Sequence, residues 1–307
     1  MLKEKKIVFP EGEDERILKA SAIIVKKKIA KVILLGDIKK ILEKFEKLKL
    51  RFNVSIINPE TAIEKEIYIQ KLYELRRRKG LSIKEARKLI LDRNYFACMM
   101  LHEGKCDAVL SGAVFSTPEI LIPAFRIIKT KKNVKKASGA VLMKIKNKYY
   151  LFADVSVQER PTATELAEIA ILSARTFEKM VGKRARVAML SYHTYSKRKD
   201  NITFFNDVRK ATNIARKKGL NVIGEVQLDA ALNKETALRK HIPFIDANVL
   251  IFPNLDAGNI GYKIAKIFSN AEMTGVIIQG LKKPVNDLSR GCDIKDIVRL
   301  AIATIKQ

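Results

Sequence analysis

Short apolar runs recur along this chain, and most are followed by a segment whose apolar residues have helical spacing. The runs KIVFP, KVILLGD, VSIINP, DAVLSG, VAMLSY, NVIGEV, NVLIFP and GVIIQG begin at positions 6, 31, 54, 107, 187, 221, 248 and 275. Continuous apolar strands that alternate with helices are typical of parallel sheets covered on both faces. The sequence therefore predicts an α/β fold with largely parallel sheets flanked by helices.

The helical segments and the breaks between them indicate how the chain is organised. We expect one helix from about Asp14 and another from Thr61 to about Gly80. The lysine-rich run KTKKNVKK at 129–136 is the best candidate for a linker, and KIKNKYY at 144–150 indicates a β-hairpin at a sheet edge. A chain of 307 residues is long enough for one large domain or two ordinary ones.

Basic residues strongly outnumber acidic ones, with 60 Lys and Arg against 33 Asp and Glu and a net charge of +27. The lysines are spread along the chain, and no nucleic-acid-binding motif accompanies them. We therefore expect a solvated basic surface that attracts small anions, with no specific nucleic-acid partner. No run approaches the roughly 18 uninterrupted apolar residues of a membrane span. The start of the chain turns acidic before a signal-like apolar region forms, so we expect a cytoplasmic protein without a membrane partner.

The cysteines give no sign of a disulfide framework or a zinc site. Cys98, Cys106 and Cys292 are odd in number and lack the paired spacing of metal ligands. The three histidines are scattered along the chain. We therefore expect reduced thiols and no bound metal.

The segment PVNDLSRGCDIKDIV at 284–298 gathers reactive side chains just before a helix. Ser289 and Arg290 lie in a turn, and Asp293 begins a run with helical apolar spacing. A hydroxyl, a guanidinium and a carboxylate thus meet near a helix N-terminus, which suits a phosphate or a developing oxyanion. A second interpretation is open as well. Asp293 and Asp296 are spaced as N-cap and N3 residues, so both carboxylates are also explained as helix caps.

This segment closely resembles the signature near the C-terminus of the phosphate acetyltransferases, or phosphotransacetylases. The resemblance spans almost the whole chain through the motifs IVFPEGEDERILKAS, LYELRRRKG, SGAV, FADV, PTATELAEIAI, GEVQLDAA, NVLIFPNLDAGNIGYKIAK and GLKKPVNDL. It implies two α/β domains with a cleft between them, and a homodimer. Domain I would comprise residues 1–132 plus 283–307, and domain II residues 133–282.

The resemblance also implies a reaction. It is the reversible transfer of an acetyl group between coenzyme A and inorganic phosphate, through attack of a thiolate on the carbonyl of acetyl phosphate. Coenzyme A would be a substrate, and no cofactor would be bound. Ser289 and Arg290 would hold the phosphate or oxyanion, and Asp296 would act as general base toward the thiol. A carboxylate in the first turn of a helix is stabilised in its charged form, which opposes its use as a base.

Further residues are implied as contacts of substrate or coenzyme A: Arg76, Ser116, Thr117, Gly258, Asn259, Tyr262, Lys263 and Asn286. Several of them have a plainer explanation that stays open beside the functional one. Arg76 is also explained as a solvated cation at a helix end, and Thr117 as an N-cap before Pro118. The segment DAGNIGYK at 256–263 is also explained as a turn.

The chain departs from the family pattern at expected ligand contacts. Ile122 stands where the family has an arginine, and the loop at 192–197 has lost a glycine. Losing one charge-assisted hydrogen bond costs about 1.5–3 kcal/mol. Arg160 and Arg126 are the candidates to replace the missing guanidinium. Two alternatives to acetyl transfer therefore stay open, an acyltransferase for a longer chain such as butyryl and a catalytically decayed relative with a binding role.

Overall fold

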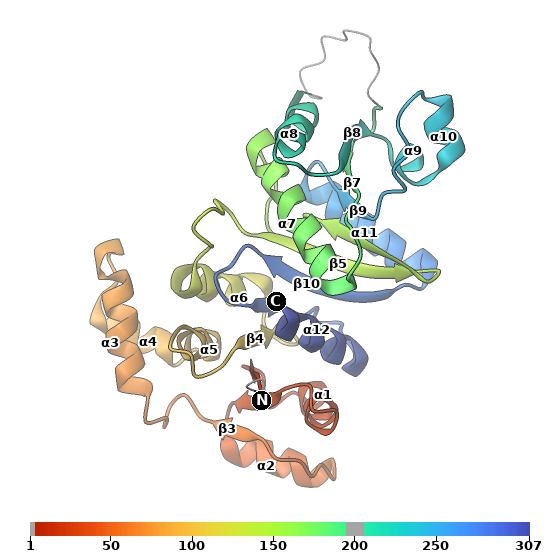
Figure 1. Cartoon of the computed structure of the whole chain (residues 1–307). Helices are drawn as coiled ribbons and strands as arrows, with labels where there is room; N and C mark the ends of the chain where they lie inside the picture. The colour runs from red at the N-terminus through yellow and green to blue at the C-terminus, as the bar shows by residue number, and fades with distance from the viewer. Residues whose placement is uncertain (1–3, 195–205) are drawn as a thin grey trace. The chain divides into compact units, whose positions relative to one another are not determined.

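The structure of the protein is a computed structural model that describes residues 4–194 and 206–307. Contacts divide the chain into two compact units, Met1–Lys131 with Leu281–Gln307 and Lys132–Gly280. Each unit contains one sheet flanked by helices (Figure 1). The predicted α/β fold with largely parallel sheets is thus confirmed.

The first unit is built on five parallel strands in the order β11-β4-β1-β2-β3. Their bounds are β1 Lys6–Phe9, β2 Lys31–Leu35, β3 Ser55–Ile57, β4 Ala108–Ser111 and β11 Val285–Asp287. The chain winds outward from β1 through β2 to β3, whereas β4 and β11 lie on the other side of β1. Ligands of open α/β sheets bind outside the carboxyl ends of the strands at such a reversal of winding.

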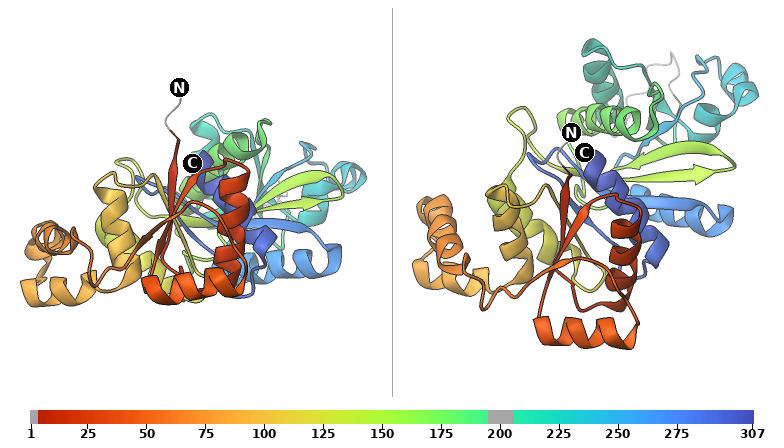
Figure 2. Two further views of the ribbon diagram at one scale, coloured as in Figure 1. Left: turned by 90° about the horizontal axis from the view of Figure 1, so that it is seen from below. Right: turned by 60° about the horizontal axis from the view of Figure 1, so that its bottom comes forward.

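The helices of this unit cover both faces of the sheet. Their bounds are α1 Glu15–Lys26, α2 Ile38–Lys47, α3 Lys65–Arg76, the 3₁₀ helix η1 Arg77–Lys79, α4 Ile83–Ile90, α5 Arg93–His102, α6 Thr117–Pro123, the π-helix η2 Ala124–Ile128 and α12 Ile294–Lys306. Helices α1 and α12 pack side by side on one face, and α5 packs on β4 from the other face (Figure 2).

Two predicted helix starts have different outcomes. Asp14 is the N-cap of α1 and accepts hydrogen bonds from the backbone N–H groups of Arg16 and Ile17, as its residue type predicts. The predicted start at Thr61 is wrong, because α3 begins at Lys65. The Asn58 side chain accepts from the N–H of Glu60, so its local bonds favour a turn over a helix.

The second unit contains a six-stranded sheet in the order β10-β5-β6-β9-β7-β8. Its strands are β5 Ser138–Ile145, β6 Lys148–Ala153, β7 Val187–Leu190, β8 Val222–Val226, β9 Val249–Ile251 and β10 Glu272–Gln279. The hairpin predicted at 144–150 is present, since β5 and β6 pair antiparallel. Its predicted place at a sheet edge is wrong, because β10 pairs with the free side of β5 and covers it.

The helices of the second unit also lie on both sides of its sheet. They are α7 Ala163–Val181, α8 Asn206–Lys217, α9 Leu228–Leu232, α10 Lys234–Arg239 and α11 Leu255–Ser269. A buried carboxylate, Asp154, accepts hydrogen bonds from the N–H groups of Gly139, Ser156, Val157 and Gln158. Burial raises the pKa of Asp154, and these four backbone bonds oppose the rise. The carboxylate therefore fixes the loop that follows β6.

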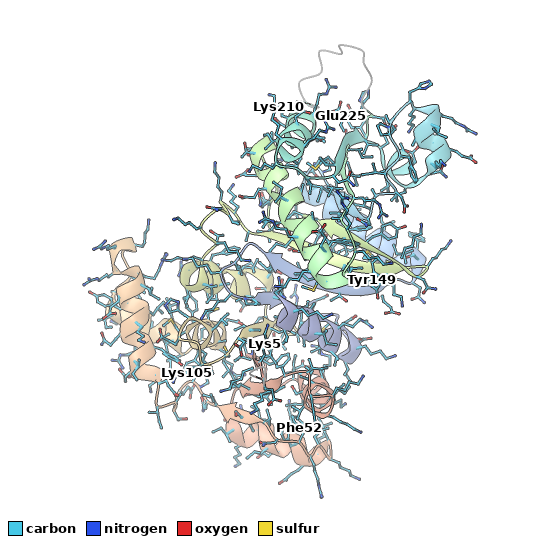
Figure 3. The ribbon with its side chains drawn as sticks, viewed as in Figure 1. Lys5, Phe52, Lys105, Tyr149, Lys210 and Glu225 are labelled. Atoms are coloured by element: carbon cyan, nitrogen blue, oxygen red, sulfur yellow. The ribbon has the colours of Figure 1, made fainter. Side chains whose placement is uncertain are left out.

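The lysines do not gather on one element. Lys5, Lys105 and Lys210 are exposed, and they belong to the segment before β1, the loop after α5 and helix α8 (Figure 3). Among the described residues, no helix combines the length and the apolar character needed to cross a membrane.

Candidate active site

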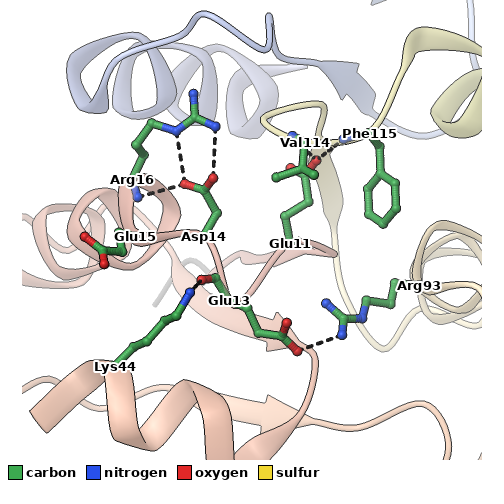
Figure 4. Close-up of a pocket in the computed structure, with 9 residues that line it drawn as sticks. All are labelled: Glu11, Glu13, Asp14, Glu15, Arg16, Lys44, Arg93, Val114 and Phe115. Atoms are coloured by element: carbon green, nitrogen blue, oxygen red, sulfur yellow. Dashed lines mark hydrogen bonds and ion pairs between the residues drawn. The ribbon is translucent and has the colours of Figure 1, made fainter. Parts of the chain in front are cut away.

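The loops that follow β1, β4 and β11 meet at the carboxyl edge of the first sheet, where its winding reverses. The N–H of Leu288 donates to the carbonyl of Ser111 at 2.6 Å, which ties the loop after β11 to the end of β4. A cavity of about 430 Å³ opens beside the loops after β1 and β4 (Figure 4). It is lined by Glu11, Glu13, Asp14, Glu15, Arg16, Lys44, Arg93, Val114 and Phe115.

Glu11 holds the loop after β4 in place. The residue is only 4% exposed, and its carboxylate accepts from the consecutive N–H groups of Gly112, Ala113, Val114 and Phe115 at 2.7–3.1 Å. A run of backbone N–H groups of this kind forms a concavity that binds anions. Here the anion belongs to the chain itself. These N–H groups are therefore already satisfied and do not face an incoming phosphate.

Ser116 and Thr117 follow this loop and begin α6. Ser116 is the N-cap, and its N–H and hydroxyl donate to Glu119 at 2.7 and 2.6 Å. These bonds lower the pKa of Glu119. Thr117 is the first helical residue rather than the N-cap, and its hydroxyl donates to Asp287 Oδ2 at 2.6 Å. Both hydroxyls thus have partners within the unit, and their contact with substrate stays a prediction.

Asp287 is a buried carboxylate beside the turn that carries Ser289. It is 3% exposed, and its Oδ1 lies so close to Gly112 that a Cβ there would be 2.4 Å away. Burial raises the pKa of Asp287 to about 6, the bond from Thr117 opposes this rise, and the charge of Glu11 adds to it. Within the described residues, Oδ1 accepts no hydrogen bond.

The turn at 289–292 presents two of the predicted catalytic side chains to solvent. Ser289 and Arg290 are both exposed. The turn is closed by the N–H of Cys292, which donates to the carbonyl of Ser289 at 2.8 Å, and by the N–H of Gly291, which donates to Ser289 Oγ at 3.3 Å. The side chains of Ser289 and Arg290 are thus both accessible to solvent on the same turn.

The third predicted catalytic residue, Asp296, lies in the first turn of α12. Asp293 and Asp296 form a reciprocal capping box, with the N–H of Asp296 donating to Asp293 at 2.7 Å. Asp296 Oδ1 accepts from Arg299 at 2.6 Å, and the Asp296 side chain is 16% exposed. This geometry agrees with the interpretation of Asp293 and Asp296 as helix caps. The role of Asp296 as general base stays a prediction.

Asn286 lies on β11 and points into the unit. Its side chain is fully buried, and its amide donates to Thr304 Oγ1 at 2.9 Å and to Gln307 Oε1 at 2.6 Å. These bonds tie β11 to α12. A contact of Asn286 with substrate stays a prediction that this geometry does not favour.

A second cavity, of about 350 Å³, lies at the C-terminal end of α3. Its lining contains four cations and one carboxylate: Leu72, Arg76, Lys79, Gly80, Leu81, Glu85, Lys88, Leu89, Tyr95 and Arg126. The carboxylate of Glu85 is engaged by Ser82 in a capping box. Arg126 Nη1 donates to Tyr95 Oη at 2.7 Å, which orients its guanidinium. The excess of positive charge suits a polyanionic ligand.

Two positions of the family pattern bear on this cavity. Ile122 is 45% exposed and is absent from its lining, so no guanidinium comes from that position. Arg126 supplies one instead, beside Arg76. Arg160 is exposed in the second unit. Of the altered loop at 192–197, residues 195–197 lie outside the described residues.

The segment DAGNIGYK forms the beginning of α11, so the alternative of a turn is wrong. A Cβ on Gly258 would lie 2.0 Å from the carbonyl oxygen of Asp154, which shows why glycine is needed for this close packing. Asn259 Nδ2 donates to the carbonyl of Val155 at 3.0 Å. The ammonium of Lys263 lies 6.0 Å from the centre of the Tyr262 ring. The close approach of Gly258 is thus made within its own unit, and its contact with coenzyme A stays a prediction.

Two residues of the site, Glu11 and Arg16, are missing from the set of site residues predicted from the sequence. The charged run PEGEDER is the signal that could have indicated them. Glu11 and Arg16 both come from this run, directly after the carboxyl end of β1. Side chains at that end of a parallel strand lie where ligands of α/β sheets bind.

Comparisons with known proteins show which family this chain resembles over its length. The profile of the phosphate acetyl/butaryl transferase family matches residues 2–305. The chain is 42% identical to a phosphate acetyltransferase of Clostridium acetobutylicum, covering 99% of this chain and 94% of the relative. It is 44% identical to the phosphate acetyltransferase of Bacillus subtilis, covering 99% and 95%. A crystal structure of a phosphotransacetylase from Streptococcus pyogenes superposes with a TM-score of 0.92 at 39% identity, covering 100% of this chain and 94% of that one.

The raised pKa of Asp287 leads to a pH-dependent prediction. Because the folded protein holds this proton up to a pH of about 6, ionising Asp287 destabilises the fold as the pH rises from about 4 to above 6. Asp287→Asn removes that effect and still accepts from Thr117. Relative to wild type, its free energy of unfolding should therefore increase by about 1–3 kcal/mol between pH 4 and pH 7.5. Urea denaturation at both pH values measures this.

The exposed carboxylate of Glu60 provides a matched control for this measurement. The difference in free energy of unfolding between Glu60→Gln and wild type should be nearly the same at pH 4 and pH 7.5. An equally pH-independent difference for Asp287→Asn would contradict the assignment of a raised pKa.

Proposed function

This chain belongs to the phosphate acetyl/butaryl transferase family, and on that premise we propose that it is a phosphate acetyltransferase. It interconverts acetyl-CoA and inorganic phosphate with acetyl phosphate and coenzyme A. The observation that carries this proposal is the exposed pair of Ser289 and Arg290 at the carboxyl edge of a parallel sheet. The pair stands in a chain 42–44% identical, over 99% of its length, to phosphate acetyltransferases of two bacteria.

The reaction sets three physical tasks. The protein must hold a phosphate, assist deprotonation of a thiol whose reference pKa is about 8.5, and stabilise the oxyanion formed on the carbonyl. Arg290 offers a planar, permanently charged donor fork for the phosphate or oxyanion, and Ser289 offers a hydroxyl donor beside it. Since the N–H groups of the loop after β4 are bound to Glu11, side-chain cations have to supply this function.

Asp296 is the proposed general base. Its Oδ1 accepts from Arg299 and its Oδ2 accepts weakly, at 3.3 Å, from the N–H of Asp293. To take a proton from the thiol, the carboxylate has to exchange one of these bonds for the substrate. The capping role and the catalytic role therefore compete for the same oxygens.

We propose that the cavity around Arg76 and Arg126 holds part of coenzyme A, which is a polyanion. Arg76, Lys79, Lys88 and Arg126 give it four cations, and Tyr95 orients one of them. In this arrangement Arg126 replaces the guanidinium that the family carries at the position of Ile122. The contacts of Gly258, Asn259, Tyr262 and Lys263 with coenzyme A stay predictions.

A homodimer is the proposed assembly. Helix α11 presents Ile260, Ile264, Ile267 and Phe268 with 50–86% of each residue exposed. Their spacing places them on one side of the helix, and an apolar face of this kind is typical of an interface. The cytoplasmic location and the cleft between the domains stay predictions.

The direct test is formation of acetyl-CoA from acetyl phosphate and coenzyme A by the purified protein. We expect activity to persist after metal chelation, because protein cations hold the anions in this proposal. Butyryl phosphate, offered in competition, distinguishes an acetyltransferase from an enzyme for longer acyl chains. Absence of turnover with either acyl phosphate would favour a decayed relative with a binding role.

Two variants should separate the roles of Arg290 and Asp296. Arg290→Ala removes a donor to the transition state and should lower kcat by about 10²- to 10³-fold. Asp296→Asn preserves the side-chain shape, and loss of the base should lower kcat by about 10²- to 10⁴-fold at neutral pH. For Asp296→Asn alone, activity should partly return as the pH rises and thiolate forms unaided. Rates measured between pH 6 and pH 9.5 test this.

The capping interpretation makes the opposite prediction for the same variant. A folded Asp296→Asn protein with full activity, and a stability change of no more than about 1 kcal/mol, would remove Asp296 from the mechanism.

Arg126→Gln should raise the KM for coenzyme A by about 10- to 100-fold with little change in kcat, because one charge-assisted hydrogen bond is lost. Arg78→Gln is the matched control, since Arg78 is exposed on η1 and lies outside the cavity lining. It removes the same charge nearby. Equal KM values for the two variants would show that Arg126 makes no specific contact with coenzyme A.

A further inference from the structure

Arg16 joins three loops at the carboxyl edge of the first sheet. Its Nε and Nη2 donate to the two carboxylate oxygens of Asp14 at 3.1 and 2.9 Å. Nη2 also donates to the carbonyl of Ala113 at 2.7 Å, in the loop after β4. Nη1 donates to the carbonyls of Arg290 at 2.7 Å and Cys292 at 3.1 Å, in the turn after β11. Every nitrogen of the guanidinium is used.

These contacts require the planar fork of arginine. Asp14 fixes the plane of the guanidinium through two parallel bonds, and the remaining donors then point at carbonyls in two different loops. A lysine ammonium offers three donors at one point on a flexible stem and cannot span the same partners. The Arg16 side chain is 32% exposed, so these bonds are partly shielded from water.

The turn at 289–292 receives two hydrogen bonds from Arg16 through its backbone carbonyls. Its own backbone bonds, Cys292 to Ser289 and Gly291 to Ser289, close the turn on itself. Within the described residues, the hydrogen bonds that join this turn to the rest of the first unit are those from Arg16 to Arg290 and Cys292. One of the two carbonyls of this turn that accept from Arg16 belongs to Arg290 itself.

We propose that Arg16 is a positioning residue for the acetyl-transfer reaction: it anchors the turn that presents Ser289 and Arg290 and so sets kcat without touching substrate. This inference rests on the proposed function, because the turn is assigned there to the phosphate or oxyanion. A misplacement of about 1 Å in a reacting group can cost about 10²-fold in rate. Loss of the anchor should therefore affect kcat more than KM.

Cys292 offers a local reporter of this anchorage. The residue is 6% exposed, and its Sγ lies 4.0 Å from Arg16 Nη1. Burial raises the pKa of Cys292 to about 11, and the charge of Arg16 opposes this rise. Removing Arg16 would raise the pKa of the thiol further and slow its reaction. A faster reaction with an alkylating reagent therefore reports exposure of the turn alone.

The other two cysteines serve as internal controls. Cys98 lies on α5 and Cys106 just before β4, and both are buried. Burial raises the pKa of Cys106 to about 12 and also raises the pKa of Cys98. Both lie on elements other than the turn after β11, so both should react faster only when the whole unit unfolds.

The test compares wild type with Arg16→Lys and Arg16→Gln by steady-state kinetics and by iodoacetamide labelling followed by mass spectrometry. In both variants we expect kcat to fall by about 10- to 100-fold, with the KM values for acetyl phosphate and coenzyme A changed by less than about threefold. Labelling of Cys292 should accelerate by at least about tenfold, with Cys98 and Cys106 unchanged. Arg93→Gln removes the same charge from the same cavity without touching the turn, and Cys292 should label in it as in wild type.

Two results would overturn the proposal. Unchanged labelling of Cys292 in both Arg16 variants would show that the turn stays anchored without this guanidinium. A uniform acceleration at all three cysteines would assign Arg16 to the stability of the whole unit. The labelling of Cys292 does not depend on turnover. If labelling shows that Arg16 anchors the turn but the wild-type protein has no acetyl-transfer activity, the proposed function is wrong and the anchorage by Arg16 is still supported.

Discussion

The candidate site depends on the hydrogen bonds between the carboxylate of Glu11 and the loop after β4. Placing a charge at 4% exposure is unfavourable unless hydrogen bonds compensate it, and four consecutive N–H groups of one loop do so. The N–H groups of the loop after β4 thereby surround an internal carboxylate, and these four groups are not available to an anionic ligand. Glu11 also adds to the raised pKa of Asp287 across the sheet edge. The second unit contains a similar arrangement, in which the buried carboxylate of Asp154 accepts from four backbone N–H groups of that unit.

Local signals in the sequence predicted much of the fold, because strands and caps depend on neighbouring residues. The apolar runs became strands, and Asp14 and Asp293 became N-caps. The wrong helix start at Thr61 is a local error, whereas two other errors arose where a distant partner decides the outcome. The hairpin at 144–150 is internal because β10, more than a hundred residues later, pairs with it. The short strand β11 escaped prediction because its three residues form a strand only beside β4.

The site was predicted less completely for the same reason. The turn with Ser289 and Arg290 is local and could be predicted from its residues, whereas its catalytic role was implied only by the family resemblance. Arg16 could not be placed there, because its acceptors at Ala113 and Arg290 are 97 and 274 residues away in sequence. Burial also changed the meaning of predicted contacts: the amide of Asn286 faces α12, and Gly258 packs against the carbonyl of Asp154. Residue type predicts what a side chain can do, whereas burial decides which partner it meets.

The first unit is discontinuous in sequence, and this has a consequence for biosynthesis. Strand β11 and helix α12 come from the last 27 residues of the chain, Leu281–Gln307, whereas their partners β4 and α1 are made far earlier. While the ribosome completes the intervening unit, one edge of β4 has no neighbouring strand, and such an edge invites pairing with other chains. The turn with Ser289 and Arg290 is also translated after the second unit, so a chain that stops at Gly280 contains all residues of the second unit but lacks this turn.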